Sequence, residues 1–385
     1  MVATAAAGAP KVRQVGPKAK FKTPCKAFAA AGNGDVIEID ARGDYTGDVC
    51  SIGRDRLTIR GVNGRPKIDA AGKAAEGKAI WVVKGSGTVV DNIEFSGTAV
   101  PSNNGAGIRL EGKDLTVLNC YFHHNQNGIL TTWDVGEVRV EHSEFGWNGH
   151  LNGLAHNIYA GATARFVLHA SYMHHTVGGN AVKSRAVENL ITYNRISQET
   201  GNGSYELDIS EGGKALVMGN VIQQGVESVN EHMITFGMEK TRPESRMLLV
   251  HNTIVNIRPN ARFFLHGPAA MIEARNNIFA GPGELNLRNA ALPPGNVRDL
   301  EMRFADAGAH DYALAAGSPA IDAGEDAGEW EGKPVAPEWQ YVRPGCIQAR
   351  AANGRMDAGA IESGRNDAAA VCTAPLPPPA PGKKK

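Results

Sequence analysis

The chain has 385 residues, with 40 basic and 40 acidic side chains and a formal net charge of +0 at pH 7. A neutral chain lacks the positive field on which nonspecific nucleic-acid binding depends, so we expect no nucleic-acid partner. No stretch approaches the roughly 18 consecutive apolar residues of a membrane-spanning helix, so we expect no integral membrane contact.

The first segments of the chain read as an extension and a cap. Residues 1–22 show no repeat and are expected to form an N-terminal extension. Its first eight residues lack the basic region and apolar core of a signal peptide, but they fit a mature start after one was removed. The Ala-rich segment 23–34 predicts a short helical cap, with Thr23 as N-cap and Pro24 at the first helical position.

A short pattern then recurs and closes on an apolar residue every 23 to 32 positions. Repeats of about 20–50 residues predict a solenoid, a propeller or an array, and strand-like pieces divided by Gly and Asn favour a parallel β-helix. We therefore expect one all-β solenoid over residues 35–282. The copies are Val90–Phe95, Val117–Phe122, Val140–Phe145, Leu168–Met173, Ile191–Ile196, Val217–Ile222, Leu249–Ile254 and a degenerate copy that ends at Ile278.

Small polar residues occupy one column of this repeat, two positions before its close. If the column faces inward, each side chain can bond its neighbour one coil away, about 4.8 Å along the axis. Such a ladder is tolerated in a core because every amide finds a partner. The alternative is that Asn only marks turns. The column contains Cys120, Ser143, Ser171, Asn194, Asn220, Asn252 and Asn276.

A second strand column gathers charged residues. Its buried positions are expected to be Ile129, Ile158, Val182, Leu207 and Ile234. Alternation then sends Tyr159, Lys183, Asp208 and Thr235 outward, with Asn157 and Glu206 on one side of this file and Arg185 on the other. Because adjacent coils are close, we expect Tyr159, Lys183, Arg185, Glu206 and Asp208 to share one surface patch. The flanking turns carry His156, His174, His175, Glu211 and His232.

This patch has two interpretations. It can be a surface ion-pair ladder, Lys183 with Asp208 and Arg185 with Glu206, in which each pair is worth little. It can also be a site for an acidic polysaccharide. β-Elimination at a uronic acid needs a neutralised carboxylate, a base for the C5 proton and an acid for the leaving oxygen.

The residue types suggest a role for each member of such a site. Lys183, with its pKa lowered by the neighbouring cation, is the candidate base, and Arg185 is the candidate carboxylate neutraliser. Tyr159 or His156 is the candidate acid, and Tyr159 is a second candidate base. The candidate substrate-binding residues are Asn157, His174, His175, Asn180, Tyr205 and His232. Glu206, Asp208 and Glu211 are candidate Ca²⁺ ligands or, alternatively, the acid and base of a glycoside hydrolase.

The five cysteines divide by position. Cys25 and Cys50 are 25 positions apart near one end, and Cys346 and Cys372 are 26 apart near the other. Each pair can staple an end of the solenoid, which implies an oxidising compartment, either secreted or periplasmic. Cys120 falls in the inward column and is expected to be a buried free thiol. The alternative is that all five are reduced.

The C-terminal part departs from the repeat. Residues 283–365 are expected to form an irregular closing segment. Residues 366–385 are Pro-rich, end in three lysines and are expected to be a disordered tail.

Several of these motifs together resemble a known fold family. Residues 25–360 resemble the right-handed parallel β-helix proteins of the pectate-lyase-like superfamily, and the chain is most similar to a bacterial group within it. The shared motifs are His156–Tyr159, Lys183–Ala186, Tyr193–Arg195, Ser204–Glu206, Gly317–Gly324 and Asp357–Glu362. The resemblance implies a right-handed coil and a secreted protein, in a superfamily of lyases, hydrolases, epimerases and non-enzymes.

Lys183-Ser184 also looks like the Lys-Ser motif of the chondroitinase B and alginate lyase β-helix family, whose Lys is the base. The Arg-His-Gly motif of that family is absent, because the matching segment here is Ile209–Gly212. Arg185 is the candidate substitute. The leading expectation is a monomeric, secreted polysaccharide lyase for a uronate-containing acidic polysaccharide. The alternatives are a glycoside hydrolase and a non-catalytic glycan-binding β-helix.

Overall fold

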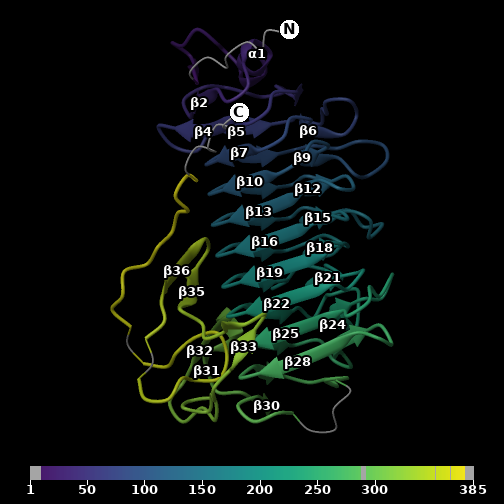
Figure 1. Cartoon of the computed structure of the whole chain (residues 1–385), viewed down its shortest axis with the longest axis vertical. Coiled ribbons are helices and arrows are strands. Elements are labelled where there is room, and N and C mark those ends of the chain that lie inside the picture. Colours follow the sequence, from purple (N-terminus) through teal and green to yellow (C-terminus); the bar gives the residue numbers. More distant parts are fainter. Residues whose placement is uncertain (1–9, 288–291, 352, 365, 378–385) are drawn as a thin grey trace, which may run out of the picture.

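The computed structural model describes residues 10–287, 292–351, 353–364 and 366–377. Three parallel sheets stack their strands along one long axis, and a single helix, α1 (Pro24–Ala30), lies at the N-terminal end of the stack (Figure 1). The chain passes once through each sheet per coil, which is the parallel β-helix expected from the repeat. The expected 366–385 tail extends past residue 377, so its last eight residues lie outside the described chain, as do residues 1–9.

The first sheet contains eleven strands within the described residues. They are β1 (Val12–Val15), β2 (Val36–Asp40), β4 (Thr58–Val62), β7 (Thr88–Asp91), β10 (Leu115–Leu118), β13 (Glu137–Glu141), β16 (Arg165–His169), β19 (Glu188–Thr192), β22 (Lys214–Met218), β25 (Arg246–Val250) and β28 (Met271–Arg275). β1 pairs with β2, so the sheet begins inside the segment expected to be only an extension.

The second sheet carries the charged column and has nine strands in the described chain. They are β3 (Cys50–Ile52), β6 (Ala79–Val83), β9 (Ala106–Leu110), β12 (Asn127–Thr131), β15 (Ile158–Ala160), β18 (Val182–Ser184), β21 (Leu207–Ile209), β24 (His232–Phe236) and β27 (Arg262–His266).

The third sheet has ten strands among the described residues. They are β5 (Lys67–Asp69), β8 (Glu94–Ser96), β11 (Tyr121–His123), β14 (Glu144–Gly146), β17 (Tyr172–His174), β20 (Arg195–Ser197), β23 (Val221–Gln224), β26 (Thr253–Asn256), β29 (Ile278–Ala280) and β30 (Val297–Asp299). β30 pairs in parallel with β29, so this sheet continues past residue 282, the expected end of the solenoid.

The polar column forms the inward ladder. Asn194 donates from Nδ2 to Oδ1 of Asn220 at 2.9 Å, and Asn220 donates to Asn252 at the same distance. The last expected member was wrong by one residue: Asn252 bonds Oδ1 of Asn277 at 2.9 Å, whereas Asn276 faces His251 and the backbone of Glu325. The closing residue of that copy is therefore Phe279 rather than Ile278.

Stacked apolar side chains fill the coil between the three sheets. Phe95, Phe122 and Phe145 occupy the same position in successive coils, and their ring centroids lie 4.7 and 4.8 Å apart. All three rings are fully buried. Burying a large apolar side chain stabilises a fold by about 1.5–3 kcal/mol, and this column continues with apolar residues such as Met173 and Ile196 in the next coils, which gives the solenoid a continuous core.

The helical cap covers the N-terminal end of this core. Phe28 of α1 packs its ring edge-on against Trp81 at 5.1 Å. Pro24 takes the first helical position as expected, but the side chain of Thr23 makes no capping hydrogen bond. The disulfide between Cys25 and Cys50 ties the helix to β3.

The C-terminal segment runs back along the outside of the stack toward its N-terminal end (Figure 1). It packs over the turn between the first and third sheets, where Gly345 accepts from His142 at 2.7 Å and Ala374 donates to Asn119 at 2.8 Å. We call residues 304–377 the strap. Its elements are β31 (Phe304–Asp306), a 3₁₀ turn (Ala307–Ala309), β32 (Asp311–Leu314), β33 (Glu329–Trp330), β34 (Lys333–Pro334), β35 (Trp339–Arg343) and β36 (Cys346–Ala349).

Both expected disulfides are present, since Cys346 bonds Cys372 within the strap, and Cys120 is a buried free thiol. The expectation of a disordered 366–385 tail is wrong for its first part, because Val371 pairs with Ile347 and Ala374 bonds the coil. None of the helices in the described chain has the length and apolarity needed to cross a bilayer.

Candidate functional site

The second sheet places the charged column in the predicted register. Tyr159, Lys183, Asp208 and Thr235 are direct partners on β15, β18, β21 and β24. The residue before each of them is a fully buried aliphatic side chain, so strand alternation turns the four outward.

A cavity of about 270 Å³ lies over this column. Lys183, Asp208 and Thr235 line it from the sheet, and His156, Asn180 and Tyr205 line it from the preceding turns. Two exposed loops flank it, which contribute Leu154 on one side and Met238 and Glu239 on the other. We call this space the cleft.

Close backbone approach shapes one wall of the cleft. Gly179 lies where an added Cβ would meet the carbonyl oxygen of Ala155 at 1.6 Å. Only glycine allows the two turns to approach this closely. Its neighbour Asn180 is thereby held against His156, because the Asn180 backbone N–H donates to His156 Nδ1 at 2.9 Å.

That hydrogen bond decides the state of His156. Nδ1 accepts this hydrogen bond and so carries no hydrogen of its own, which places the ring hydrogen of the neutral imidazole on Nε2. Burial, with a smaller contribution from the cations of Lys183 and Arg185, lowers the pKa of His156 to about 3. At neutral pH His156 is therefore a neutral hydrogen-bond donor rather than a cationic acid.

Asp208 is a fixed carboxylate at the base of the cleft. It accepts from Asn180 Nδ2 at 2.9 Å and from Thr235 Oγ1 at 2.6 Å, and it pairs with Lys183 Nζ at 3.1 Å. Its side chain is only 6% exposed. Three partners on neighbouring coils hold this carboxylate in one position, so it orients the lysine.

Lys183 and Arg185 converge on Glu239 instead of on Glu206. Lys183 Nζ lies 2.6 Å from Glu239 Oε1, and Arg185 Nε lies 2.8 Å from Oε2. Glu239 comes from the loop that follows β24, two coils beyond the lysine. Of the alternative ion-pair ladder, the Lys183–Asp208 pair is present, but the Arg185–Glu206 pair is not, because Glu206 is buried in the core.

The pKa of Lys183 shifts against the expected direction. Burial lowers it, but Asp208 and Glu239 together raise it by more, so the net pKa is raised. Lys183 is therefore a protonated cation in this arrangement, although the sequence suggested a lysine with a lowered pKa.

Arg185 is held from several directions. Its guanidinium lies 5.1 Å from the ring centroid of Tyr159 and 5.4 Å from that of Trp133. Arg242 donates to the Arg185 carbonyl at 2.9 Å and pairs with Glu211, which also approaches Arg185. These contacts fix the position of the arginine beside the lysine.

Two residues expected in the patch face the interior. Asn157 is fully buried and bonds Asn148 and Thr176, as part of an inward polar network. Glu206 is also fully buried, and burial raises its pKa well above the ordinary value. Each lies two positions before an outward residue, Tyr159 or Asp208, but in the turn that precedes the strand, where side chains do not alternate as they do within it. Neither can therefore contact a ligand in the cleft.

The three expected Ca²⁺ ligands lie in different surroundings. Of the three expected Ca²⁺ ligands, Glu206 is inside the coil, Asp208 is paired with Lys183, and Glu211 is paired with Arg242. Ca²⁺ takes six to eight oxygen ligands, and these carboxylates do not converge to supply them. The described residues contain no other group of acidic, His or Cys side chains with metal-site geometry.

The remaining histidines belong elsewhere. His174 ends β17 in the third sheet, where it stacks on Tyr172 and approaches Glu144 at 3.2 Å, and His175 bonds His174. His232 begins β24 beside Glu231 and does not line the cleft. His174 and His175 are thus separated from the cleft by the turn between sheets, whereas His232 lies on the same sheet as the cleft but outside its lining.

The sequence missed Glu239, Arg242 and Trp133. Glu239 and Arg242 lie in a loop outside the repeat, so no column identified them. Trp133 lies two residues after β12, in the turn that follows the strand, so the strand column did not include it either.

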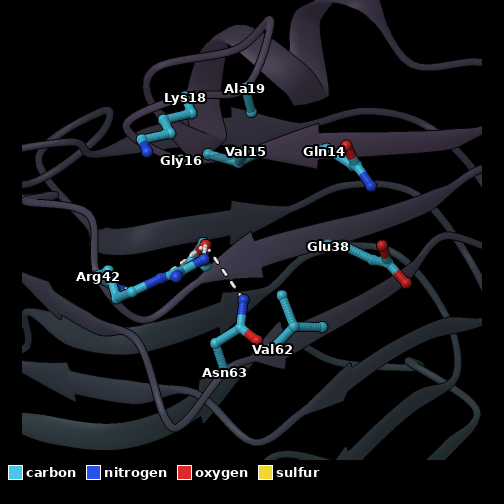
Figure 2. Close-up of a pocket in the computed structure, with 10 residues that line it drawn as sticks. Gln14, Val15, Gly16, Lys18, Ala19, Glu38, Arg42, Val62 and Asn63 are labelled. Carbon is cyan, nitrogen blue, oxygen red and sulfur yellow. Dashed lines mark hydrogen bonds and ion pairs between the residues drawn. The ribbon is translucent and has the colours of Figure 1, made fainter.

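A second hollow of about 280 Å³ lies near the N-terminal cap (Figure 2). Arg42 pairs with Asp40 there, and Asn63 donates to the same carboxylate at 3.1 Å, as the dashed lines show. The hydrogen bonds from Arg42 hold the pKa of Asp40 below its usual value. This carboxylate is satisfied by its own neighbours, so we assign the functional site to the cleft.

No protein-family model matches the chain, and no curated protein matches it by sequence. A solved structure does resemble it: the crystal structure of pectate lyase Pel9A has a TM-score of 0.56 and 14% sequence identity, and the match covers 92% of this chain and 98% of that chain. At this identity the likeness shows a shared pectate-lyase-like β-helix fold.

Proposed function

We propose that the protein is a polysaccharide lyase that cleaves a uronate-containing acidic polysaccharide by β-elimination. The observation that carries this proposal is that Lys183, which lines the cleft, and the nearby Arg185 together hold one carboxylate, that of Glu239. A uronate needs such a site, because the negative charge that develops when C5 loses its proton spreads onto the sugar carboxylate. The fold that the chain shares with a pectate lyase supports the same reaction class.

In this reaction a base removes the proton from C5, the bond from C4 to the leaving oxygen breaks, a C4–C5 double bond forms, and the leaving oxygen gains a proton. We assign the carboxylate to Arg185 and Lys183, because both are cations in the structure. Tyr159 is the register partner of Lys183 and borders Arg185, so we assign it both proton transfers: its phenolate oxygen takes the proton from C5 and then passes that proton to the leaving oxygen. His156 offers its Nε2–H to a substrate oxygen.

The lysine is removed from the role of base by its neighbours. Asp208 and Glu239 raise its pKa, and a substrate carboxylate that replaced Glu239 would act in the same direction. Lys183 then stabilises the developing charge, as an ammonium group aimed at the carboxylate does.

The test is a panel of uronate polymers with neutral polymers as controls. We expect absorbance from an unsaturated uronate, and product masses lower by one water than those of hydrolysis products. Arg185→Ala should lower kcat/KM by about 10²–10³-fold, and Tyr159→Phe by about 10²–10⁴-fold. Lys214→Ala, a surface lysine of β22 in the first sheet, is the matched control and should leave the rate unchanged.

Two other results would reject the lyase. New reducing ends without the chromophore indicate a glycoside hydrolase, which would have to work without the buried Glu206. Binding without turnover on every polymer indicates a glycan-binding β-helix. That alternative has one observation in its favour, because internal carboxylates neutralise both cations in the unliganded cleft.

We also propose a secreted or periplasmic location. Two disulfides, Cys25–Cys50 and Cys346–Cys372, support it, since such bonds persist in oxidising compartments. Mass measurement of the secreted protein after alkylation in denaturant without reductant checks the disulfides: only Cys120 should be modified, and the other four cysteines should react only after reduction.

A further inference from the structure

Glu239 differs from the other carboxylates of the cleft in how it is held. Asp208 is buried and bonded by two side chains of the sheet and by Asn180 of a preceding turn, whereas the Glu239 side chain is 42% exposed. In the described structure its carboxylate contacts only Lys183 and Arg185. Asp208 is thus part of the scaffold, and Glu239 is placed on the cations from outside.

Only the side chain has to move to release the two cations. The backbone of the loop is anchored, because Gly237 N donates to Ile209 O at 2.9 Å and Glu239 N donates to Ser210 O at 2.8 Å. Gly237 has a φ of +69°, which lets the chain turn directly after β24. The long, exposed glutamate side chain can rotate into solvent while this backbone stays in place.

The charged side chains around the cleft balance only when one carboxylate occupies the position of Glu239. Lys183, Arg185 and Arg242 face Asp208, Glu211 and Glu239, so the closed arrangement is balanced. Rotation of Glu239 into solvent exposes one net positive charge at the point where two donors already match a carboxylate. An incoming carboxylate restores both the charge balance and the two hydrogen-bonded contacts.

We propose that Glu239 is an internal substitute for the substrate carboxylate: it occupies the carboxylate subsite of the free protein, and a uronate must displace it to bind. That the ligand is a uronate rests on the proposed function, whereas the displacement itself does not require catalysis. If Glu239 leaves the site open for only a fraction of the time, the apparent affinity for a carboxylate ligand is reduced by that fraction. Glu239 would therefore weaken the binding of every acidic ligand that needs this subsite.

The test is calorimetric or NMR titration with glucuronate, using glucose as the uncharged probe. Glu239→Gln and Glu239→Ala should bind glucuronate about tenfold more tightly than the wild type, with no change toward glucose. Glu244→Gln removes the same charge from the same loop without touching the cations, and it should bind like the wild type. Unchanged or weaker glucuronate binding in both Glu239 variants overturns the proposal.

The outcome separates from that of the lyase assay. If the variants bind glucuronate more tightly but neither they nor the wild type cleave any polymer, the displacement stands and the proposed function fails. If the wild type cleaves a polymer and Glu239→Gln loses the rate without gaining affinity, the lyase stands and the displacement fails.

Discussion

The side chain of Glu206 carries an acidic proton inside the coil. It is fully buried, and within the described residues neither carboxyl oxygen has a hydrogen-bond partner. Burial disfavours the ionised form and raises the pKa well above the ordinary carboxyl value. The folded protein keeps this proton to higher pH than the unfolded chain does, so the folded state becomes less stable as pH rises above the ordinary carboxyl range.

Glu206→Gln should remove this dependence. We expect the wild type to lose stability relative to the variant by at most about 1.4 kcal/mol per pH unit from acidic pH upward. Urea unfolding midpoints of both proteins over a pH series measure the effect, and Glu244→Gln, an exposed carboxyl, is the control. Parallel pH profiles for the wild type and Glu206→Gln would contradict a protonated Glu206.

The sequence predicts the direction of a side chain correctly where the residue lies within a strand, because there the side chains alternate between the two faces. Tyr159, Lys183 and Asp208 lie in the expected register because each follows a buried aliphatic residue in a repeated strand. Glu206 and Asn157 were misplaced because they precede the strands, where a turn resets the direction of side chains. Glu239 was not predictable from any column, since its partner Lys183 is 56 residues away and the loop between coils follows no period.

At the scale of the repeating element, one coil depends on the next through the Asn ladder. Asn220 donates from Nδ2 to Ile191 O and to Asn252 Oδ1, and its own Oδ1 accepts from both nitrogens of Asn194. The sequence predicts the ladder because Asn stands two positions before the closing apolar residue in four consecutive copies. The last step was misread because Asn276 and Asn277 are adjacent, as are the apolar residues after them, and a slip of one residue turns each side chain to the other face.

Asn220→Ala should destabilise the protein by about 2–4 kcal/mol, because it leaves buried donors and acceptors on both neighbouring coils without partners. Asn296→Ala is the matched control. Asn296 receives the same pair of hydrogen bonds from Asn277, but it is only half-buried at the end of the ladder, so water can replace it. Equal shifts in the midpoint of chemical unfolding for the two variants would argue against the ladder as a buried network.

Across the whole molecule, the strap joins coils that lie far apart in sequence. Glu338 N donates to Tyr193 Oη at 3.1 Å, and Ala374 reaches Asn119 across 255 positions. Such contacts follow neither the period of the coil nor any motif. The sequence therefore predicts that the C-terminal segment is irregular but not which coils it contacts. The two disulfides consequently hold different things: Cys25–Cys50 fixes the cap on the core, and Cys346–Cys372 fixes the strap to itself on the outside.

Replacing each pair by serine should therefore give different results. The Cys25→Ser, Cys50→Ser variant should lose about 3 kcal/mol, because its bond closes a loop of 25 residues and ties down the helix that covers Trp81 and the end of the core. The Cys346→Ser, Cys372→Ser variant should keep most of the stability of the coil but admit faster proteolysis and amide exchange after residue 346, because the described strands of the strap pair with one another and not with the three sheets of the coil. Thermal unfolding with peptide-resolved hydrogen exchange measures both effects. If loss of the second bond instead unfolds the second sheet along with the strap, the C-terminal segment is part of the cooperative core, and the cleft depends on it.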